Sequence, residues 1–168
     1  MNHISLLIGN GCSLLAMFTD SVSTTQKTTK RILLTQCVSQ VIYCIGTAAL
    51  KGYSGAVQNI VSILRNLFAI REKPNRFVEW GLILLGVALG LVCNNMGVLG
   101  LLPTIANLQY ALIILKLRQN EALLKGSFLL HAAMFAVYNG ALYNLVGIVT
   151  NSIVVITTAI SLVKCLKK

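Results

Sequence analysis

Charged residues are scarce in this chain, and acidic residues are the scarcest of all. Only 11% of the 168 residues are charged, and 4 acidic residues stand against 14 basic ones, for a net charge of +10. The charges fall in short clusters between long uncharged stretches, without a basic face that carries interleaved aromatic residues. This pattern excludes a nucleic-acid-binding surface. With 56% hydrophobic residues, the chain is also too apolar for a water-soluble domain.

The motifs of common enzyme classes are also missing. The sequence has no phosphate-binding glycine loop, no dinucleotide-binding glycine pattern, no HExxH zinc motif and no GxSxG nucleophile turn. Its 5 cysteines are odd in number and lie mostly in apolar stretches, which predicts buried small hydrophobic residues rather than a disulfide framework. We therefore expect no enzymatic activity, no cofactor and no metal. The first residues lack a basic leader and a small-residue cleavage site, so we expect the first apolar segment to stay in the mature protein.

Long apolar segments dominate the rest of the chain. A helix needs roughly 20 residues to cross the hydrocarbon of a bilayer, and somewhat fewer when flanking side chains reach the interface. The segments that qualify are about Ile4–Thr19, Ile32–Leu50, Gly55–Ile70, Phe77–Cys93, Val98–Leu115, Ala122–Tyr138 and Ala141–Val163. They predict an all-α integral membrane fold with seven transmembrane helices, whose main partner is the lipid bilayer.

The basic residues alternate between the linkers and so orient the predicted spans. Twelve of the 14 lie in the first, third and fifth linkers and the tail: Lys27, Lys30, Arg31, Arg71, Lys73, Arg76, Lys116, Arg118, Lys125, Lys164, Lys167 and Lys168. Lys51 alone lies on the other side, and Arg65 falls inside a span. Cytoplasmic loops carry the excess of Lys and Arg, which predicts a bacterial inner-membrane protein with its N-terminus outside and its C-terminus cytoplasmic. Trp80, Tyr53 and Tyr138 are expected at the membrane interfaces.

One segment of the sequence recurs. Residues 53–66 read YSGAVQNIVSILRN and residues 138–151 read YNGALYNLVGIVTN, with seven of fourteen positions identical at an offset of 85. Polar residues are costly in a bilayer, so their recurrence predicts two parallel three-helix repeats, residues 1–70 and 98–168, joined by a connector helix in 71–97. Gly86 and Gly90 form a GxxxG pattern in the connector. It would let the connector pack on one repeat or would join two copies in a homodimer.

The YSGAVQNIVSILRN segment, with its preceding basic linker in a small basic seven-span chain, resembles the YgjV-like bacterial inner-membrane proteins. The three-one-three architecture is more distantly similar to the SWEET, PQ-loop and nicotinamide riboside transporters. In SWEET proteins a symmetry-related Asn pair on the third helix of each repeat lines the substrate pocket, which implies that role for Asn59 and Asn144 here. The Pro-Gln pair of PQ-loop relatives is absent, because Pro103 is followed by Thr104.

Asparagines are the first candidate site residues. Asn59 and Asn144 are expected to face each other across the repeat interface, where their amides can grip a small uncharged polar solute. The alternative is that they bond helix to helix, each contributing on the order of 1 kcal/mol. Further polar candidates for the same pathway are Asn66, Asn151, Asn10 and Asn107.

Two ionisable residues inside the spans complete the candidate set. Arg65 can attract an anionic substrate or lipid, or it can extend its guanidinium to the inner surface. His131 can titrate near neutral pH, or stay neutral in a bond to a neighbouring helix. All four acids are expected at cytoplasmic helix ends, away from a proton relay, which favours passive transport. The predicted function is therefore a facilitative small-solute transporter, and the alternative is a receptor, sensor or complex subunit on the same fold.

Overall fold

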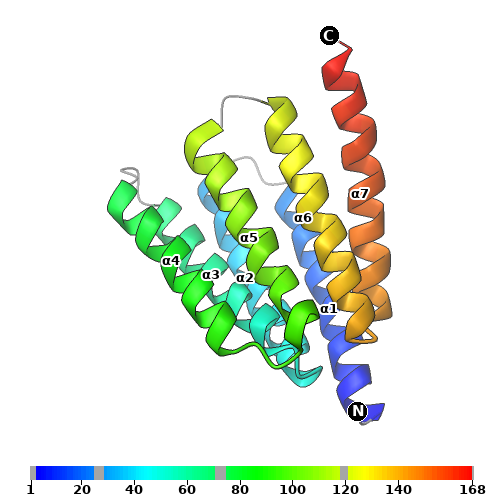
Figure 1. Cartoon of the computed structure of the whole chain (residues 1–168). Coiled ribbons are helices and arrows are strands. Elements are labelled where there is room, and N and C mark those ends of the chain that lie inside the picture. The colour runs from blue at the N-terminus through cyan, green and yellow to red at the C-terminus, as the bar shows by residue number, and fades with distance from the viewer. Residues whose placement is uncertain (1–2, 25–28, 71–74, 118–120, 168) are drawn as a thin grey trace.

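The computed structural model describes residues 3–24, 29–70, 75–117 and 121–167, and these residues form seven α-helices without any strand (Figure 1). The helices are α1 (His3–Thr24), α2 (Thr29–Ala49), α3 (Tyr53–Ala69), α4 (Arg76–Val92), α5 (Gly97–Leu117), α6 (Glu121–Ala141) and α7 (Leu145–Leu166). The all-α prediction is thus confirmed for this part of the chain. Part of the charge pattern lies outside it, at Lys27, Arg71, Glu72, Lys73, Arg118 and Lys168.

Six of the helices form a ring, and α4 lies outside it. Around the ring, α1 packs on α2, α2 on α3, α3 on α5, α5 on α6, α6 on α7, and α7 back on α1. In Figure 1, α5 and α6 lie in front of α2 and α1, with α4 at one edge beside α3 and α5. The halves α1–α3 and α5–α7 therefore meet at two contacts, which we call the α3–α5 seam and the α1–α7 seam.

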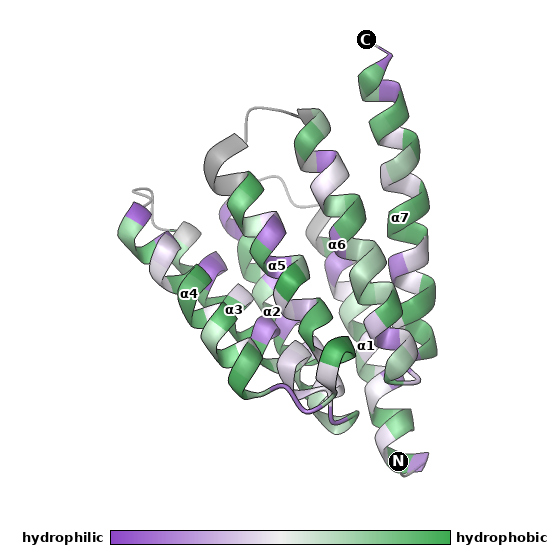
Figure 2. Ribbon diagram, viewed as in Figure 1, coloured by the Kyte–Doolittle hydropathy of each residue, from purple (hydrophilic) through white to green (hydrophobic). Residues whose placement is uncertain are grey.

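The packing places small and polar residues inside and large apolar residues outside. The buried polar residues are Ser13, Ser39, Ser54, Gln58, Ser62, Asn66, Thr104, Ser127 and Asn144. All seven helices expose large apolar side chains. Figure 2 shows that hydrophobic residues recur along every helix. A soluble domain buries such side chains, whereas helices in lipid pack through small residues and interhelical hydrogen bonds. This arrangement suits a lipid surrounding.

Helix α7 is the one described helix that is both long and apolar enough to cross a membrane by itself, with 22 residues and a mean hydropathy of 2.1. Two other stretches are apolar but shorter, Leu33–Ala49 and Gly97–Ile113. The helices α3 and α4 have only 17 residues each, and α1 is interrupted by several polar side chains. The prediction of seven helices is therefore confirmed, whereas seven membrane crossings remain a prediction.

The α2–α3 and α6–α7 turns have the same backbone conformation. Each turn places one residue at positive φ, Lys51 at 60° and Tyr143 at 56°. Each then makes a backbone bond five residues back, from Gly52 N to Thr47 O at 2.8 Å and from Asn144 N to Asn139 O at 2.9 Å. This pattern is the Schellman motif, which terminates a helix. The last residue of the motif, Gly52 or Asn144, directly precedes the first turn of the next helix. Both helix pairs are thereby held as tight antiparallel hairpins.

These turns correct the register of the predicted repeat. The sixth predicted span ended at Tyr138 and the seventh began at Ala141, but α6 continues to Ala141 and Asn144 directly precedes α7. The sequence match at an offset of 85 therefore pairs residues at different places, because α2 and α6 both begin and end 92 residues apart. At that offset the counterpart of Asn59 is Asn151, and the counterpart of Asn144 is Gly52.

Candidate functional site

Asn144, one of the two asparagines expected to grip a solute, is a helix cap. Its side-chain oxygen accepts from Gly147 N at 3.0 Å, at the first turn of α7. Its amide nitrogen donates to Ser13 Oγ at 2.8 Å and to Asn139 Oδ1 at 2.9 Å. The residue is only 4% exposed. Its hydrogen-bonding groups are thus used within the protein, at the α1–α7 seam.

Asn10 belongs to the same seam rather than to a cavity. Its Oδ1 accepts from Val146 N at 3.1 Å, and its Nδ2 donates to Leu6 O at 3.0 Å and to Tyr143 O at 3.4 Å. Asn10 on α1 therefore satisfies a backbone donor at the start of α7, which would otherwise lack a partner. The structure brings Asn10 and Asn144 together as structural contacts.

Asn59 lies apart from this pair. It is half-buried on α3, and its side chain makes no hydrogen bond to any residue in the described part of the chain. Its counterpart Asn151 donates to Gly147 O, on its own helix, at 2.9 Å. Asn66 is buried and bonds to the thiol of Cys37 on α2. Among the predicted asparagines, Asn59 is the one whose side-chain amide has no hydrogen bond to a described residue.

Gln58, which sequence reasoning missed, organises the α3–α5 seam. It is 3% exposed, and its Nε2 donates to Gly86 O at 2.8 Å and to Thr104 Oγ1 at 3.4 Å. Asn107, a predicted site residue, donates from Nδ2 to Gln58 Oε1 at 3.1 Å. One glutamine therefore joins α3 to both α4 and α5, and Asn107 is part of this structural network.

The GxxxG residues of α4 face the same seam. A Cβ on Gly90 would lie 2.1 Å from Thr104 Oγ1, and one on Gly86 would lie 3.3 Å from Val61 Cγ1. Both glycines are buried against α3 and α5. Two roles were predicted for this pattern, and the structure shows the glycines in packing within the chain. The connector α4 contacts both halves of the ring rather than one repeat. The face is consequently covered in a single chain.

An aromatic stripe runs along α6 toward the centre of the ring. Phe128, His131, Phe135 and Tyr138 follow one another with ring centroids 6.2, 4.8 and 6.4 Å apart. Tyr110 of α5 joins the stripe, 5.4 Å from the His131 ring. The rings occur at spacings of three and four residues, which places them on one face of the helix.

His131 is bonded to the neighbouring helix. Its Nδ1 lies 3.2 Å from the carbonyl oxygen of Ala106 on α5, so this nitrogen carries a hydrogen and donates it. The other charged candidate, Arg65 of α3, interacts electrostatically with both Tyr110 and His131. The structure thus brings Arg65 and His131 together, on the sides of α3, α5 and α6 that face one another.

Tyr138 fills the interior of the ring at the end where the α2–α3 and α6–α7 turns lie. Its hydroxyl accepts from Gly55 N at 3.2 Å and lies 3.5 Å from Ser54 Oγ, so it reaches across from α6 to α3. Its ring packs with Leu50 and Leu142, and the three form a buried cluster. Tyr138 was expected at the membrane interface, but it is 1% exposed because it fills the space that Gly55 leaves.

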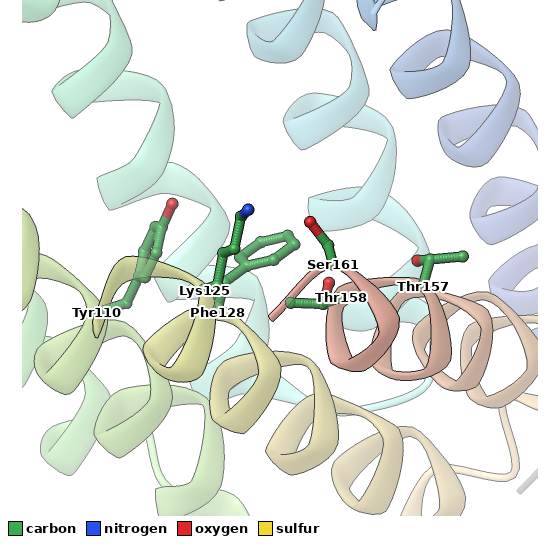
Figure 3. Close-up of a pocket in the computed structure, with 6 residues that line it drawn as sticks. All are labelled: Tyr110, Lys125, Phe128, Thr157, Thr158 and Ser161. Carbon is green, nitrogen blue, oxygen red and sulfur yellow. The ribbon is translucent and has the colours of Figure 1, made fainter. Parts of the chain in front are cut away.

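A pocket of about 310 Å³ lies near the opposite end of the ring, on α5, α6 and α7. It is lined by Tyr110, Lys125, Phe128, Thr157, Thr158 and Ser161. Figure 3 shows the Tyr110 hydroxyl, the Lys125 amine and the Ser161 hydroxyl directed to the same side. The aromatic stripe therefore leads from the closed end at Tyr138 to Phe128 in this pocket. In the sequence, this pocket could have been signalled only by the hydroxyl residues that are spaced along the last apolar segment.

Asp20 departs from its predicted place at a helix end. Its carboxylate accepts a hydrogen bond from Ser39, which lies midway along α2 and is buried. The acid thus lies between α1 and α2 rather than in the solvent. Glu79 lies in the first turn of α4, as predicted.

Comparison with known proteins gives the family but no structural template. No curated protein and no solved structure matches the chain, so the predicted similarity to SWEET and PQ-loop proteins has no support from these comparisons. The model of the Imp-YgjV family, described as a bacterial inner membrane protein, matches residues 7–168. The match spans nearly the whole described ring of helices together with α4. The chain belongs to the YgjV family of bacterial inner-membrane proteins.

Proposed function

We propose that this protein is a facilitative carrier of a small solute, with seven membrane crossings, its N-terminus outside and its C-terminus in the cytoplasm. The observation that carries the proposal is the difference between the two ends of the ring. One end is filled by Tyr138 with Leu50 and Leu142, and the other contains the pocket. A solute path closed on one side and hollow on the other is the form that an alternating-access carrier takes in one of its states.

The distribution of charge supports the proposed topology. In Figure 1, α2 and α4 begin and α7 ends at the end of the bundle where the C-terminus lies. The described basic residues at these helix ends are Lys30, Arg31, Arg76, Lys164 and Lys167. Lys51 lies at the opposite end, in the α2–α3 turn. Lys and Arg are retained on the cytoplasmic side of inner-membrane proteins, so the pocket would open toward the cytoplasm.

The arrangement of the ring supports two parallel repeats. Exchanging α1–α3 for α5–α7 converts the α3–α5 seam into the α7–α1 seam, and the two hairpin turns correspond at an offset of 92 residues. The connector α4 packs outside the ring. Residues 1–70 and 98–168 would then rock about the two seams, with 71–97 as the connector. In this proposal the site residues shift from the asparagine pair to the pocket, with Asn59, His131 and Arg65 along the path.

The rival is a membrane receptor, sensor or complex subunit on the same fold. The observation that favours it is the α1–α7 seam, where Asn10 and Asn144 tie the two halves together by several hydrogen bonds. A rigid ring would bind a ligand in the pocket without carrying it across the membrane.

Uptake into liposomes separates the two functions. Purified protein would be reconstituted and assayed with radiolabelled sugars, nucleosides, vitamins, amino acids and phosphate esters, beside protein-free liposomes. Ser161→Leu fills the pocket and should abolish uptake, whereas Ser152→Leu, the same change on α7 outside the pocket lining, should leave it intact. Uptake that survives Ser161→Leu would contradict the proposed path, and the absence of uptake across the panel would favour the rival.

A further inference from the structure

We propose that the interior of the ring, where α3, α5 and α6 face one another, binds the carboxylate of a small planar solute through Arg65. The planar part of the solute would lie against the aromatic stripe beside His131. This inference rests on the proposed function and deepens it, because it names the class of solute that would pass along the ring. Binding can be measured without transport, so the site and the carrier can fail independently.

Arg65 is a charged side chain inside an apolar helix. It is half-buried on α3 and makes neither a hydrogen bond nor an ion pair with any residue in the described part of the chain. Its electrostatic interactions are with Tyr110 and His131, which carry no negative charge. The described acids lie elsewhere, Asp20 between α1 and α2 and Glu79 in the first turn of α4. A charge removed from water is costly without a counter-ion, so Arg65 favours an anion supplied from outside the chain.

The charge of Arg65 acts toward the middle of the ring. His131 is the middle residue of α6, which runs from Glu121 to Ala141. Arg65 interacts with this residue and with Tyr110 of α5. A guanidinium that extended past Ala69 to the lipid headgroups would lie away from the middle of α6. The interactions of Arg65 therefore favour an anion inside the ring over a lipid phosphate at the inner surface.

The donors at this level fit a carboxylate. A guanidinium presents its N–H groups as a planar fork, which can make two parallel hydrogen bonds to the two oxygens of a carboxylate. The hydroxyl of Tyr110 makes no hydrogen bond to a described residue and can donate one more. A carboxylate carries one negative charge, which the single guanidinium of Arg65 balances, whereas a phosphate ester brings nearly two. A monoanion is thus the better match.

The aromatic rings around His131 fit a planar body attached to that carboxylate. The His131 ring lies 5.4 Å from the ring of Tyr110 and 4.8 Å from that of Phe135. All three rings are only half-buried, whereas Tyr138 at the closed end is 1% exposed. Nδ1 of His131 donates to Ala106 O, so Nε2 is left as an acceptor for a ligand hydroxyl or amide. Aromatic faces pack on planar groups, so the favoured solute is an aromatic acid.

Binding would be tested with the full chain in a maltoside detergent at constant ionic strength, with benzoate as the probe. Benzamide has the same shape without the charge, and acetate has the charge without the ring. We expect benzoate to raise the unfolding temperature in a saturable way, and the other two compounds to bind much more weakly. Arg65→Gln should weaken the apparent benzoate affinity by roughly tenfold or more. Arg76→Gln, the same change on an exposed residue at the start of α4, should leave it unchanged.

Two further measurements test the premises of the site. Arg65→Lys keeps the charge but not the planar fork, so its benzoate affinity should fall between those of the unchanged chain and Arg65→Gln. Without ligand, Arg65→Gln should unfold at a temperature similar to that of Arg76→Gln, because no acidic partner is left unpaired. A much lower unfolding temperature for Arg65→Gln would reveal such a partner and would overturn the site.

The outcomes separate the site from the carrier. No saturable benzoate effect, equal binding of benzamide, or equal losses in Arg65→Gln and Arg76→Gln would overturn the carboxylate site even if liposomes take up a neutral solute. Benzoate binding that is lost only in Arg65→Gln would support the site even if no solute crosses. Short-chain phosphatidic acid would be added as a competitor. Its displacement of benzoate at lower concentration than acetate or benzamide would assign Arg65 to a lipid headgroup and would overturn the proposed solute.

Discussion

The two seams of the ring differ in how they are reinforced. At the α3–α5 seam, Gln58 bonds to α4 and α5 together, and α4 covers the contact with its buried glycines. At the α1–α7 seam the position equivalent to Gln58 is Thr150, whose hydroxyl lies 2.9 Å from Val146 O on its own helix and 3.3 Å from Met17 Sδ. Among the described helices, none contacts both α1 and α7. The α3–α5 seam thus combines three helices and the α1–α7 seam combines two. In a carrier that rocks between states, the less covered α1–α7 seam is the one that should open, and the hydrogen bonds of Asn10 and Asn144 across it would then have to break.

The largest effect should come from forcing α4 away from the α3–α5 seam. Gly90→Leu places a side chain where a Cβ alone would lie 2.1 Å from Thr104 Oγ1. Overpacking of this kind should lower the free energy of unfolding by about 3 kcal/mol, measured by SDS titration in mixed micelles. Gly81→Leu is the matched control on the same helix, because its Cβ would meet no atom within 4 Å. Equal stability of the two variants would contradict the packing of α4.

A smaller effect is expected from removing the polar centre of each seam. Gln58→Leu leaves Gly86 O and Asn107 without their partner and should cost about 2 kcal/mol of unfolding free energy. Thr150→Val, at the equivalent position of the other seam, should cost about 0.6 kcal/mol. The same SDS titration would compare them. If Thr150→Val were the more damaging, the order of the two seams would be reversed.

The cap at the α1–α7 seam should have a moderate effect. Asn144→Ala removes the acceptor for Gly147 N and the bond to Ser13, and it should cost about 1 kcal/mol of unfolding free energy. Asn59→Ala removes a side chain without a hydrogen bond to a described residue and should change stability by less than about 0.5 kcal/mol. Comparable losses in both variants would revive the symmetric asparagine pair predicted from the sequence.

An effect as small as that of Thr150→Val is expected from the Tyr138 hydroxyl, which joins α6 to α3. Tyr138→Phe keeps the ring in its cluster but removes the acceptor for Gly55 N, at a cost of about 0.6 kcal/mol in unfolding free energy. Tyr53→Phe, on an exposed side chain at the same end, should have no measurable effect. A larger loss for Tyr53→Phe would mean that the closed end is assigned to the wrong tyrosine.

The sequence was informative about helices and less so about their junctions. Hydropathy and linker charges predict the seven helices, because each helix must expose an apolar surface along much of its length. The break between α6 and α7 was predicted at the wrong residues. Its true position depends on a positive φ at Tyr143, which a tyrosine rarely adopts. The match at an offset of 85 includes a tyrosine and two asparagines, but the helix bounds and the backbone turns correspond at 92.

The site was harder to predict than the fold. An asparagine in an apolar segment is costly, but the sequence does not tell a helix cap such as Asn144 from a ligand contact. The pocket residues Thr157, Thr158 and Ser161 have hydroxyls that can bond to their own helix, so they do not stand out in an apolar segment. The aromatic residues around His131 recur at spacings of three, four and three residues, but the prediction for His131 did not use that periodicity.

The central claim, that the ring is closed at Tyr138 and hollow at the pocket, is tested most directly by labelling single cysteines. Ser161→Cys and Ser54→Cys would be made in a folded variant whose 5 native cysteines are replaced, and treated with a membrane-impermeant maleimide from either face. We predict that Ser161→Cys reacts from the cytoplasmic face and that Ser54→Cys, behind the Tyr138 closure, is protected from the outer face. Labelling of Ser54→Cys from outside together with protection of Ser161→Cys from the cytoplasm would contradict the account.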